Sequence, residues 1–98
     1  MSTMSPSPAR SGTFHWAVST PHGPVESGEC EFLVVPTTRG ELGVMAGHAA
    51  LVACVAPGEL RVTSGGAEKS YPVGAGLVEV RDNKVSLLLA SAHKTATS

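Results

Sequence analysis

The sequence predicts an all-β domain of the sandwich or barrel type. Turn-forming pairs recur at short intervals, among them Ser27-Gly28, Pro57-Gly58 and Asp82-Asn83. The segments between them are short and rich in β-branched and aromatic residues, such as "FHWAVS", "GLVEV" and "KVSLLL". Many short strands with frequent turns are typical of sandwiches and barrels. No amphipathic helix stands out.

Composition narrows the class of protein. The 98 residues fit one domain, and 42% apolar with 15% charged residues is too apolar for a disordered chain. A formal net charge of -1, without a cluster among the seven Lys and Arg residues, argues against a nucleic-acid binder. No stretch is long and apolar enough to span a bilayer, and the N-terminus lacks the apolar core of a signal peptide. We therefore expect a soluble cytoplasmic protein.

The chain divides into a folded part, residues 13–90, and two flexible tails. Residues 1–12 are rich in Ser, Thr and Pro without periodicity, and residues 91–98 look similar. The two cysteines, Cys30 and Cys54, lack metal-binding spacing and lie in apolar runs. We expect both to behave as small buried hydrophobes.

The best-defined element is the hairpin "GLVEVRDNKVSLLL" near the C-terminus. Its two-residue turn is Asp82-Asn83, because both residue types tolerate positive φ. This register pairs Val80 with Val85. One face of the hairpin, the expected core face, then holds Val78, Val80, Val85 and Leu87.

The preceding hairpin, "GELRVTSGGAEKSYPV", allows two registers. A four-residue loop over residues 65–68 pairs Val62 with Tyr71, whereas a two-residue Gly65-Gly66 loop pairs Val62 with Lys69. The hydrophobic match favours the four-residue loop. Pro72 cannot donate to a β-ladder, so we expect its amide side to face an edge or a bulge.

The segment "HAALVACVAPG", residues 48–58, is ambiguous by composition. Its alanines favour a helix, while Val52 and Val55 favour a strand. Pro57-Gly58 ends the segment after about ten residues, which is short for a helix. We therefore predict a buried strand.

The sequence carries no recognisable catalytic or metal-binding motif. No G-x-S-x-G, Walker or H-E-x-x-H pattern occurs, and no pair of carboxylates marks acid/base chemistry. None of the four histidines has a second ligand at i+2, i+3 or i+4. One stretch differs from ordinary loops: "GELGVMAGHAAL", residues 40–51, is glycine-rich yet apolar and holds Glu41 and His48. From composition alone it is a structural turn whose glycines supply positive φ.

This stretch resembles the signature loop of the epsilon subunit of bacterial F-type ATP synthases, which reads G-E-L-G, two residues, then P-G-H-A-P-L. Downstream, "VAPGELRV" and "VGAGLVEVRDNKVSLLL" are similar to the family's next strand and hairpin. Upstream, residues 14–43 follow its opening strands. The resemblance covers residues 14–92 in order, and the central loop is its most specific part.

The resemblance implies a flattened β-sandwich of about ten short, mostly antiparallel strands. It also implies a rotor subunit of the central stalk that is not a catalyst and needs no cofactor. Such a subunit joins the gamma subunit to the ring of membrane c subunits and helps couple proton or sodium flow to ATP synthesis. The implied location is the cytoplasmic face of the bacterial inner membrane, peripheral and held only through the complex, with no nucleic-acid partner.

Carried over residue by residue, the resemblance assigns c-ring contacts to Glu41, Gly43, Val44, Met45, Gly47 and His48. Glu41 and His48 would meet polar loops of the c subunits, and an exposed apolar side chain such as Val44 or Met45 would help fill the joint. For the gamma subunit the candidates are Leu77 and Leu88, on the second face of the last hairpin.

The chain departs from the family pattern in two ways. Ala46 and Ala50 stand where the family usually has Pro, so we expect a more mobile loop. The chain also ends nine residues after Leu89, too soon for the C-terminal helical hairpin that inhibits ATP hydrolysis in full-size members. We expect either a naturally short subunit without that module or a piece cut from a longer chain.

Two other classes of protein remain as alternatives. Lipoyl-type carrier domains are small sandwiches with a modified Lys at a hairpin tip, and Lys84 lies beside the turn in "RDNKV". There, Asn83 separates Asp82 from the lysine, unlike the usual Asp-Lys pair. An OB-like binding barrel would need basic and aromatic residues on one face, and this chain has few of either.

Overall fold

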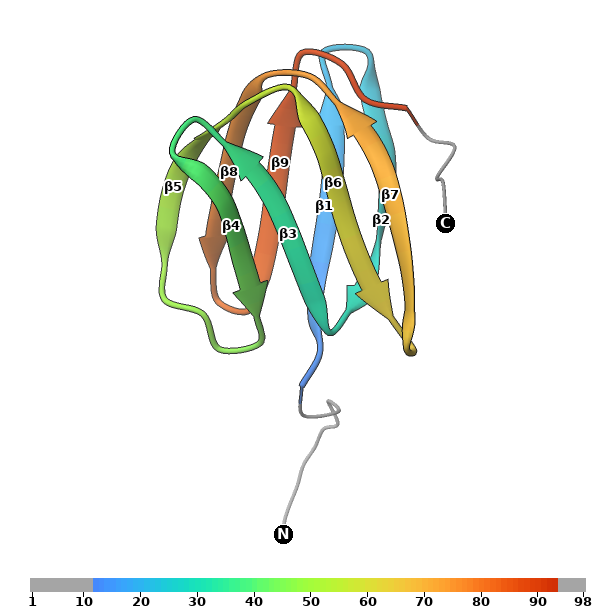
Figure 1. Cartoon of the computed structure of the whole chain (residues 1–98), viewed down its shortest axis with the longest axis vertical. Helices are drawn as coiled ribbons and strands as arrows, with labels where there is room; N and C mark the ends of the chain where they lie inside the picture. Colours follow the sequence, from blue (N-terminus) through green and yellow to red (C-terminus); the bar gives the residue numbers. More distant parts are fainter. Residues whose placement is uncertain (1–11, 94–98) are drawn as a thin grey trace, which may run out of the picture.

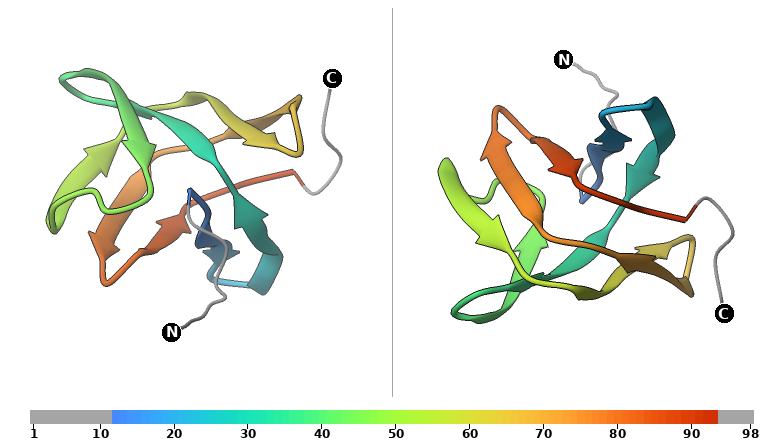
Figure 2. Two further views of the ribbon diagram at one scale, coloured as in Figure 1. Left: turned by 90° about the horizontal axis from the view of Figure 1, so that it is seen from below. Right: turned by 90° about the horizontal axis from the view of Figure 1, so that it is seen from above.

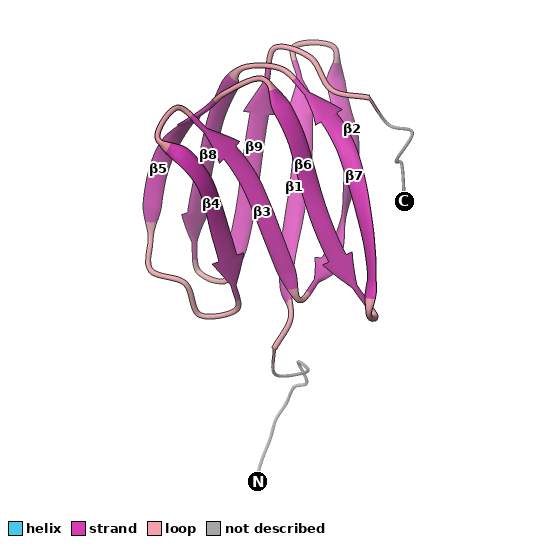
Figure 3. Ribbon diagram, viewed as in Figure 1, coloured by secondary structure: helices cyan, strands magenta, loops and turns pink. Residues whose placement is uncertain are grey.

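The computed structural model describes residues 12–93, and these residues form nine β-strands and no helix (Figure 1, Figure 3). The predicted all-β class is confirmed. In this range there is accordingly no helix of the length and apolarity needed to cross a membrane. The strands are β1 (Phe14–Thr20), β2 (Gly23–Cys30), β3 (Phe32–Thr37), β4 (Gly40–Met45), β5 (Leu51–Val55), β6 (Gly58–Ser64), β7 (Ala67–Val73), β8 (Gly76–Arg81) and β9 (Lys84–Leu89).

The strands belong to one sheet that curls into two facing layers. Its order is β2-β1-β9-β8-β5-β3-β6-β7, with β4 attached to β3. Figure 1 shows β4, β3, β6 and β7 in the front layer and β5, β8, β9, β1 and β2 behind them. Every pair of named strands is antiparallel except β1 with β9. The expected sandwich of mostly antiparallel strands is therefore present.

The core lies between the layers and is built from alternate residues of each strand. A strand directs successive side chains to opposite faces, so every second position of a half-buried strand is apolar. In β9 the pattern is regular, with Val85, Leu87 and Leu89 buried. The remaining core residues on these inner faces include Phe14, Trp16 and Val18 of β1, Leu33 and Val35 of β3, Val44 of β4, and Leu60 and Val62 of β6.

The β8–β9 hairpin has the predicted register and turn. Val80 pairs with Val85 and Val78 with Leu87. Asp82 and Asn83 adopt φ values of 51° and 61°, which are the positive values that a two-residue hairpin turn requires.

The β6–β7 hairpin differs from the prediction, because its loop is the two-residue Gly65-Gly66 turn. Ser64 pairs with Ala67, which places Lys69 rather than Tyr71 opposite Val62. Both glycines have positive φ, 60° and 82°, so they form the turn without steric cost. The hydrophobic match predicted the wrong register because it assumed that the residue opposite Val62 is buried. β7 is an edge strand, and the Lys69 side chain at that position is exposed.

Burial of β5 and of the two cysteines follows from strand alternation. The segment after His48 contains the predicted strand, but only its inner face is buried, and Val52 and Cys54 face outward. Cys54 is therefore exposed, contrary to expectation, whereas Cys30 is buried. Burial raises the pKa of the Cys30 thiol to about 12. Pro72 lies on the edge strand β7, as expected of a residue that cannot donate to a ladder.

The ordered chain continues past the expected boundary at residue 90. Ala92 forms an antiparallel bridge with Val73, and the amide of His93 donates to the Pro72 carbonyl at 3.3 Å. Residues 91–93 therefore extend along the outer edge of β7. The rest of the two expected tails, residues 1–11 and 94–98, lies outside the described residues.

Candidate functional site

The glycine-rich stretch over residues 40–51 is a strand followed by a short loop, and not one continuous loop. Residues 40–45 form β4 and pair along their whole length with β3. Residues 46–50 then connect β4 to β5. Glu41 consequently lies near the start of β4, about 13 Å of strand from Met45 at the usual rise per residue, and His48 lies beyond that end. The structure does not bring these two side chains together at one loop tip.

Alternation along β4 decides which predicted contact residues are accessible. Glu41, Gly43 and Met45 face outward, and Met45 is 62% exposed. Val44 faces the core and is 1% exposed. The expectation that Val44 could fill a joint with a partner is therefore wrong, because the side chain already belongs to the core. We call the outward residues Glu41, Gly43 and Met45, together with Gly47 and His48, the β4 strip.

The Glu41 carboxylate is held by an ion pair on the outer face of the front layer. Its Oε1 lies 2.9 Å from Nη2 of Arg61 on β6, and Arg61 also approaches Glu68 at 3.9 Å. Since β3 lies between β4 and β6, the Arg61 side chain crosses β3 beside Val34, its partner in the ladder. This explains why Val34 is buried on an outward face. The ion pair itself is solvent-exposed and contributes about 1 kcal/mol at most.

Gly43 serves a neighbour within the chain. A Cβ at Gly43 would lie 3.3 Å from two carbons of the Phe32 ring, so the absence of a side chain lets this ring lie over β4. Phe32 pairs directly with Met45, and both are exposed. Together they form an apolar end to the β4 strip. Sequence reasoning missed Phe32, because only the β3–β4 register reveals its position.

The loop after β4 begins with a tight turn. The amide of His48 donates to the Met45 carbonyl at 3.1 Å, and Gly47 has a φ of 81°. Positive φ at the third position of a four-residue turn is the feature of type II turns, in which Pro is favoured at the second position and Gly at the third. Ala46 occupies that second position. The family's Pro-Gly pattern thus corresponds to a turn that this chain forms with Ala-Gly.

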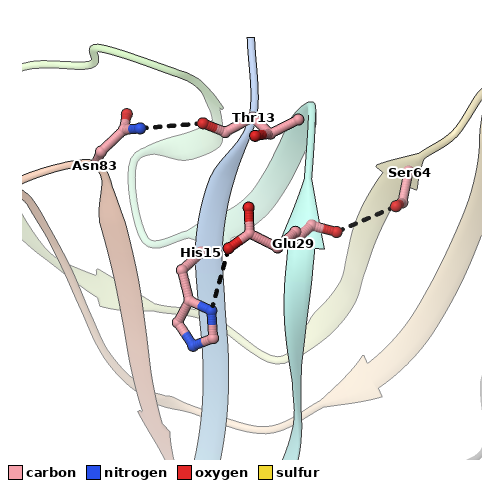
Figure 4. A network of polar contacts seen from close by, with 5 residues as sticks. All are labelled: Thr13, His15, Glu29, Ser64 and Asn83. Atoms are coloured by element: carbon pink, nitrogen blue, oxygen red, sulfur yellow. Dashed lines mark hydrogen bonds and ion pairs between the residues drawn. The ribbon is translucent and has the colours of Figure 1, made fainter. Parts of the chain in front are cut away.

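The same loop is tied to the rest of the sandwich by Asn83. The Asn83 Oδ1 accepts from the amide of Gly47 at 2.9 Å, and its Nδ2 donates to the Thr13 carbonyl at 3.0 Å. Its own carbonyl accepts from the amide of His15 at 3.2 Å. Figure 4 shows Asn83 reaching across to Thr13 beside β1. One turn residue therefore joins the β8–β9 turn, the loop after β4 and the start of β1.

A second exposed apolar surface lies on the back layer. Leu77 of β8 and Leu88 of β9 are direct cross-strand partners and are 50% and 57% exposed. Cys54 pairs with Leu77 from the other side, and Val52 of the same strand is 67% exposed. We call Leu77, Leu88 and Val52 the apolar patch. Its residues face away from the core, and its strands β5, β8 and β9 lie in the layer opposite β4 (Figure 1).

The remaining polar residues show no catalytic arrangement. No group of three or more metal-binding side chains occurs in the described range. His15 and Glu29 are 3.9 Å apart on the exposed face of β1 and β2, visible in Figure 4. Lys84 begins β9 opposite Arg81, one position beyond the Asp82-Asn83 tip. It therefore lacks the tip position of a carrier lysine.

Comparison with known proteins identifies the family of this chain. The sequence model of the ATP synthase delta/epsilon chain, beta-sandwich domain, matches residues 13–95. The chain belongs to this family. The epsilon chain of ATP synthase from Rhodopseudomonas palustris is 39% identical over 86% of this chain and 62% of its own length. That of Shouchella clausii is 42% identical over 84% of this chain and 62% of its own length.

A solved structure carries the same fold. A chain of the Euglena gracilis mitochondrial ATP synthase, in a structure of OSCP, F1 and c-ring, superposes with a TM-score of 0.77 at 26% identity. The match covers 83% of this chain and 52% of that one. This chain thus spans less than two thirds of the relatives it matches, and the part in common is the β-sandwich domain.

Replacing Ala46 by Pro should stabilise the sandwich, because Pro fixes the φ angle that the second turn position uses. We expect a gain of about 0.4–1 kcal/mol in the free energy of unfolding, measured by urea denaturation. The matched change at the next residue, Gly47→Ala, should cost about 1 kcal/mol or more, since Gly47 has positive φ. Equal effects of the two variants would contradict this turn geometry.

Replacing Asn83 by Gly should loosen the loop after β4. Glycine keeps the positive φ of the turn but removes both side-chain hydrogen bonds, so we expect a loss of about 1–2 kcal/mol. Hydrogen exchange at the amide of Gly47 should accelerate. Asp82→Gly is the control, because Asp82 shares the positive φ. If both variants unfold at the same urea concentration, Asn83 does not anchor the loop.

Proposed function

We propose that this chain is the sandwich part of an epsilon subunit in the central stalk of an F-type ATP synthase. In this role it joins the gamma subunit to the c-ring and helps couple proton or sodium flow to ATP synthesis. Membership of the delta/epsilon family supports the proposal that the chain is part of an ATP synthase complex. The presence of exposed surfaces on both layers supports the role of a connector between two partners.

The apolar patch is the proposed contact for the gamma subunit. Exposed apolar groups that lie side by side mark association surfaces more strongly than isolated ones. Leu77 and Leu88 meet this condition, because they are cross-strand neighbours on one outward face. Val52, on the strand next to β8, widens the same surface.

The β4 strip is the proposed contact for the c-ring. Its outward residues on β4 change from polar Glu41 through Gly43 to apolar Met45, and polar His48 follows beyond the strand. This arrangement suits a partner surface made of polar loops with apolar side chains between them. The contact therefore extends along the side of β4, and Glu41 and His48 lie at its two ends. Gly47, which has no neighbouring atom where a Cβ would stand, leaves room for the partner backbone at the His48 end.

The sandwich also suits the transmission of torque. Its interior is closely packed, and close-packed interiors have low compressibility and transmit strain. A load applied at the β4 strip would pass through the shared core to the apolar patch on the other layer. The coupling function needs no catalytic group on this chain. The proposed location is the cytoplasmic face of the bacterial inner membrane, peripheral and held through the complex.

The double variant Leu77→Glu with Leu88→Glu should abolish the complex with a matching gamma subunit. Burying two unpaired carboxylates at an interface costs on the order of several kcal/mol of binding free energy. This cost would weaken binding by roughly 100-fold or more. Size-exclusion chromatography of the mixed proteins at micromolar concentration measures the complex. Met45→Glu, an equally exposed apolar position on the other layer, is the control and should leave it intact. Loss of the complex in both would refute the assignment of this patch.

Single replacements at the two ends of the β4 strip test the c-ring contact. Glu41→Ala and His48→Ala should each leave the fold intact and each weaken attachment of the chain to detergent-solubilised c-ring, by roughly tenfold per lost polar contact. Pull-down of the ring by tagged chain, with gamma present, measures attachment. An effect of only one replacement would show that the ring meets one end of the sandwich and not the side of β4. An effect on thermal stability alone would indicate a purely structural role.

A further inference from the structure

The two layers remain open along one side, between the edge strands β2 and β7. Within the described residues, β2 pairs only with β1, and β7 pairs only with β6 apart from the bridge to Ala92. The opening forms a slot of about 370 Å³. At one end it is closed by contacts between β2 and the β6–β7 turn, including the Ser64 hydroxyl, which donates to the Glu29 carbonyl at 3.1 Å (Figure 4).

The floor of the slot contains two aromatic side chains whose polar atoms have no protein partner within the described residues. Trp16 and Tyr71 are 4% and 6% exposed, and their ring centroids lie 5.7 Å apart. Among residues 12–93 no hydrogen bond reaches the Trp16 Nε1 or the Tyr71 hydroxyl, although buried polar groups are nearly always paired. Both groups can donate, so the slot can accommodate two acceptors such as the carbonyl oxygens of a peptide.

The rim of the slot is charged on its inward side. Glu26 of β2 and Lys69 of β7 lie on the inward faces of their strands, opposite Val18 and Val62. Neither forms an ion pair within the described range. Glu26 is half-buried whereas Lys69 is exposed, so the charge inside the slot is the Glu26 carboxylate. Burial, with the nearby Glu26 carboxylate, raises the pKa of Tyr71, which keeps its hydroxyl protonated as a donor.

The free edge of β7 already accepts an extended segment at its far end. Residues 91–93 run antiparallel to β7 there, with Ala92 bridged to Val73. Figure 2 shows the chain after β9 crossing between the β1–β2 hairpin and the β6–β7 hairpin. The edge beyond this bridge, from Ala67 to Tyr71, has only β6 as a partner in the described chain. Exposed edges of this kind bind peptides by strand addition.

We propose that this slot binds an extended segment of a partner protein, which adds to the free edge of β7 and places a basic side chain in the slot. The backbone carbonyls of the segment would accept from Trp16 and Tyr71. The basic side chain would lie against the two rings and the Glu26 carboxylate, where cation–π attraction and ion pairing act together. The contact is separate from the β4 strip and the apolar patch.

A titration that uses Trp16 as the reporter tests this proposal, because it is the one tryptophan of the chain. The probe is a capped hexapeptide of alternating valine and arginine, and the comparison peptide alternates valine and glutamate. We expect saturable changes in tryptophan emission with a dissociation constant about tenfold lower for the arginine peptide, equivalent to ~1.4 kcal/mol. Equal constants, or no saturable change up to millimolar peptide, would overturn the proposal.

Two matched charge variants locate the binding. Glu26→Gln should raise the dissociation constant of the arginine peptide about tenfold. Glu68→Gln makes the same chemical change on β7 but outside the slot, because Glu68 faces Arg61. This variant should leave the dissociation constant of the arginine peptide within about twofold of the unmodified protein's value. Equal effects would assign the binding to general charge and contradict the slot. Binding that appears only after removal of residues 94–98 would assign the slot to this chain's own C-terminal residues and also contradict a partner segment.

Discussion

The alternation of inward and outward side chains along paired strands is the constraint on which the rest of this structure depends. Once two layers enclose a common core, each strand gives one face to packing and retains one for contact with other molecules. Val44 and Met45 illustrate the consequence, since adjacent residues in one motif are 1% and 62% exposed. The motif therefore combines core packing with an external surface, and only half of it is available to a partner.

The same constraint leaves two separate outward surfaces, which the proposed function assigns to two partners. The outward face of the front layer carries the β4 strip, and that of the back layer carries the apolar patch (Figure 1). Both faces rest on one continuous core. Asn83 adds a connection at the sandwich end, because its side chain joins the loop after β4 to the start of β1. The shared core and this connection keep the two surfaces in a fixed relation.

The sequence predicted those parts of the fold that depend on local patterns. The turn at Asp82-Asn83 and its register follow from residues that are adjacent in the chain, and the structure confirms both. The predicted four-residue loop over residues 65–68 was wrong, because apolar matching presumes burial on both strands and β7 is an edge strand. The anchoring role of Asn83 had no local signal, since its partners are 36 and 70 residues away. Residues 40–51 were expected to form one loop, because their three glycines masked the period-two pattern of β4.

Simultaneous binding tests the central claim most directly. If the two contacts lie on opposite layers, saturation with a gamma subunit should leave the affinity of the chain for detergent-solubilised c-ring undiminished. Light scattering coupled to size exclusion would then detect one assembly that contains all three components. A gamma subunit that displaces the chain from the ring, so that only two-component complexes appear, would contradict the account.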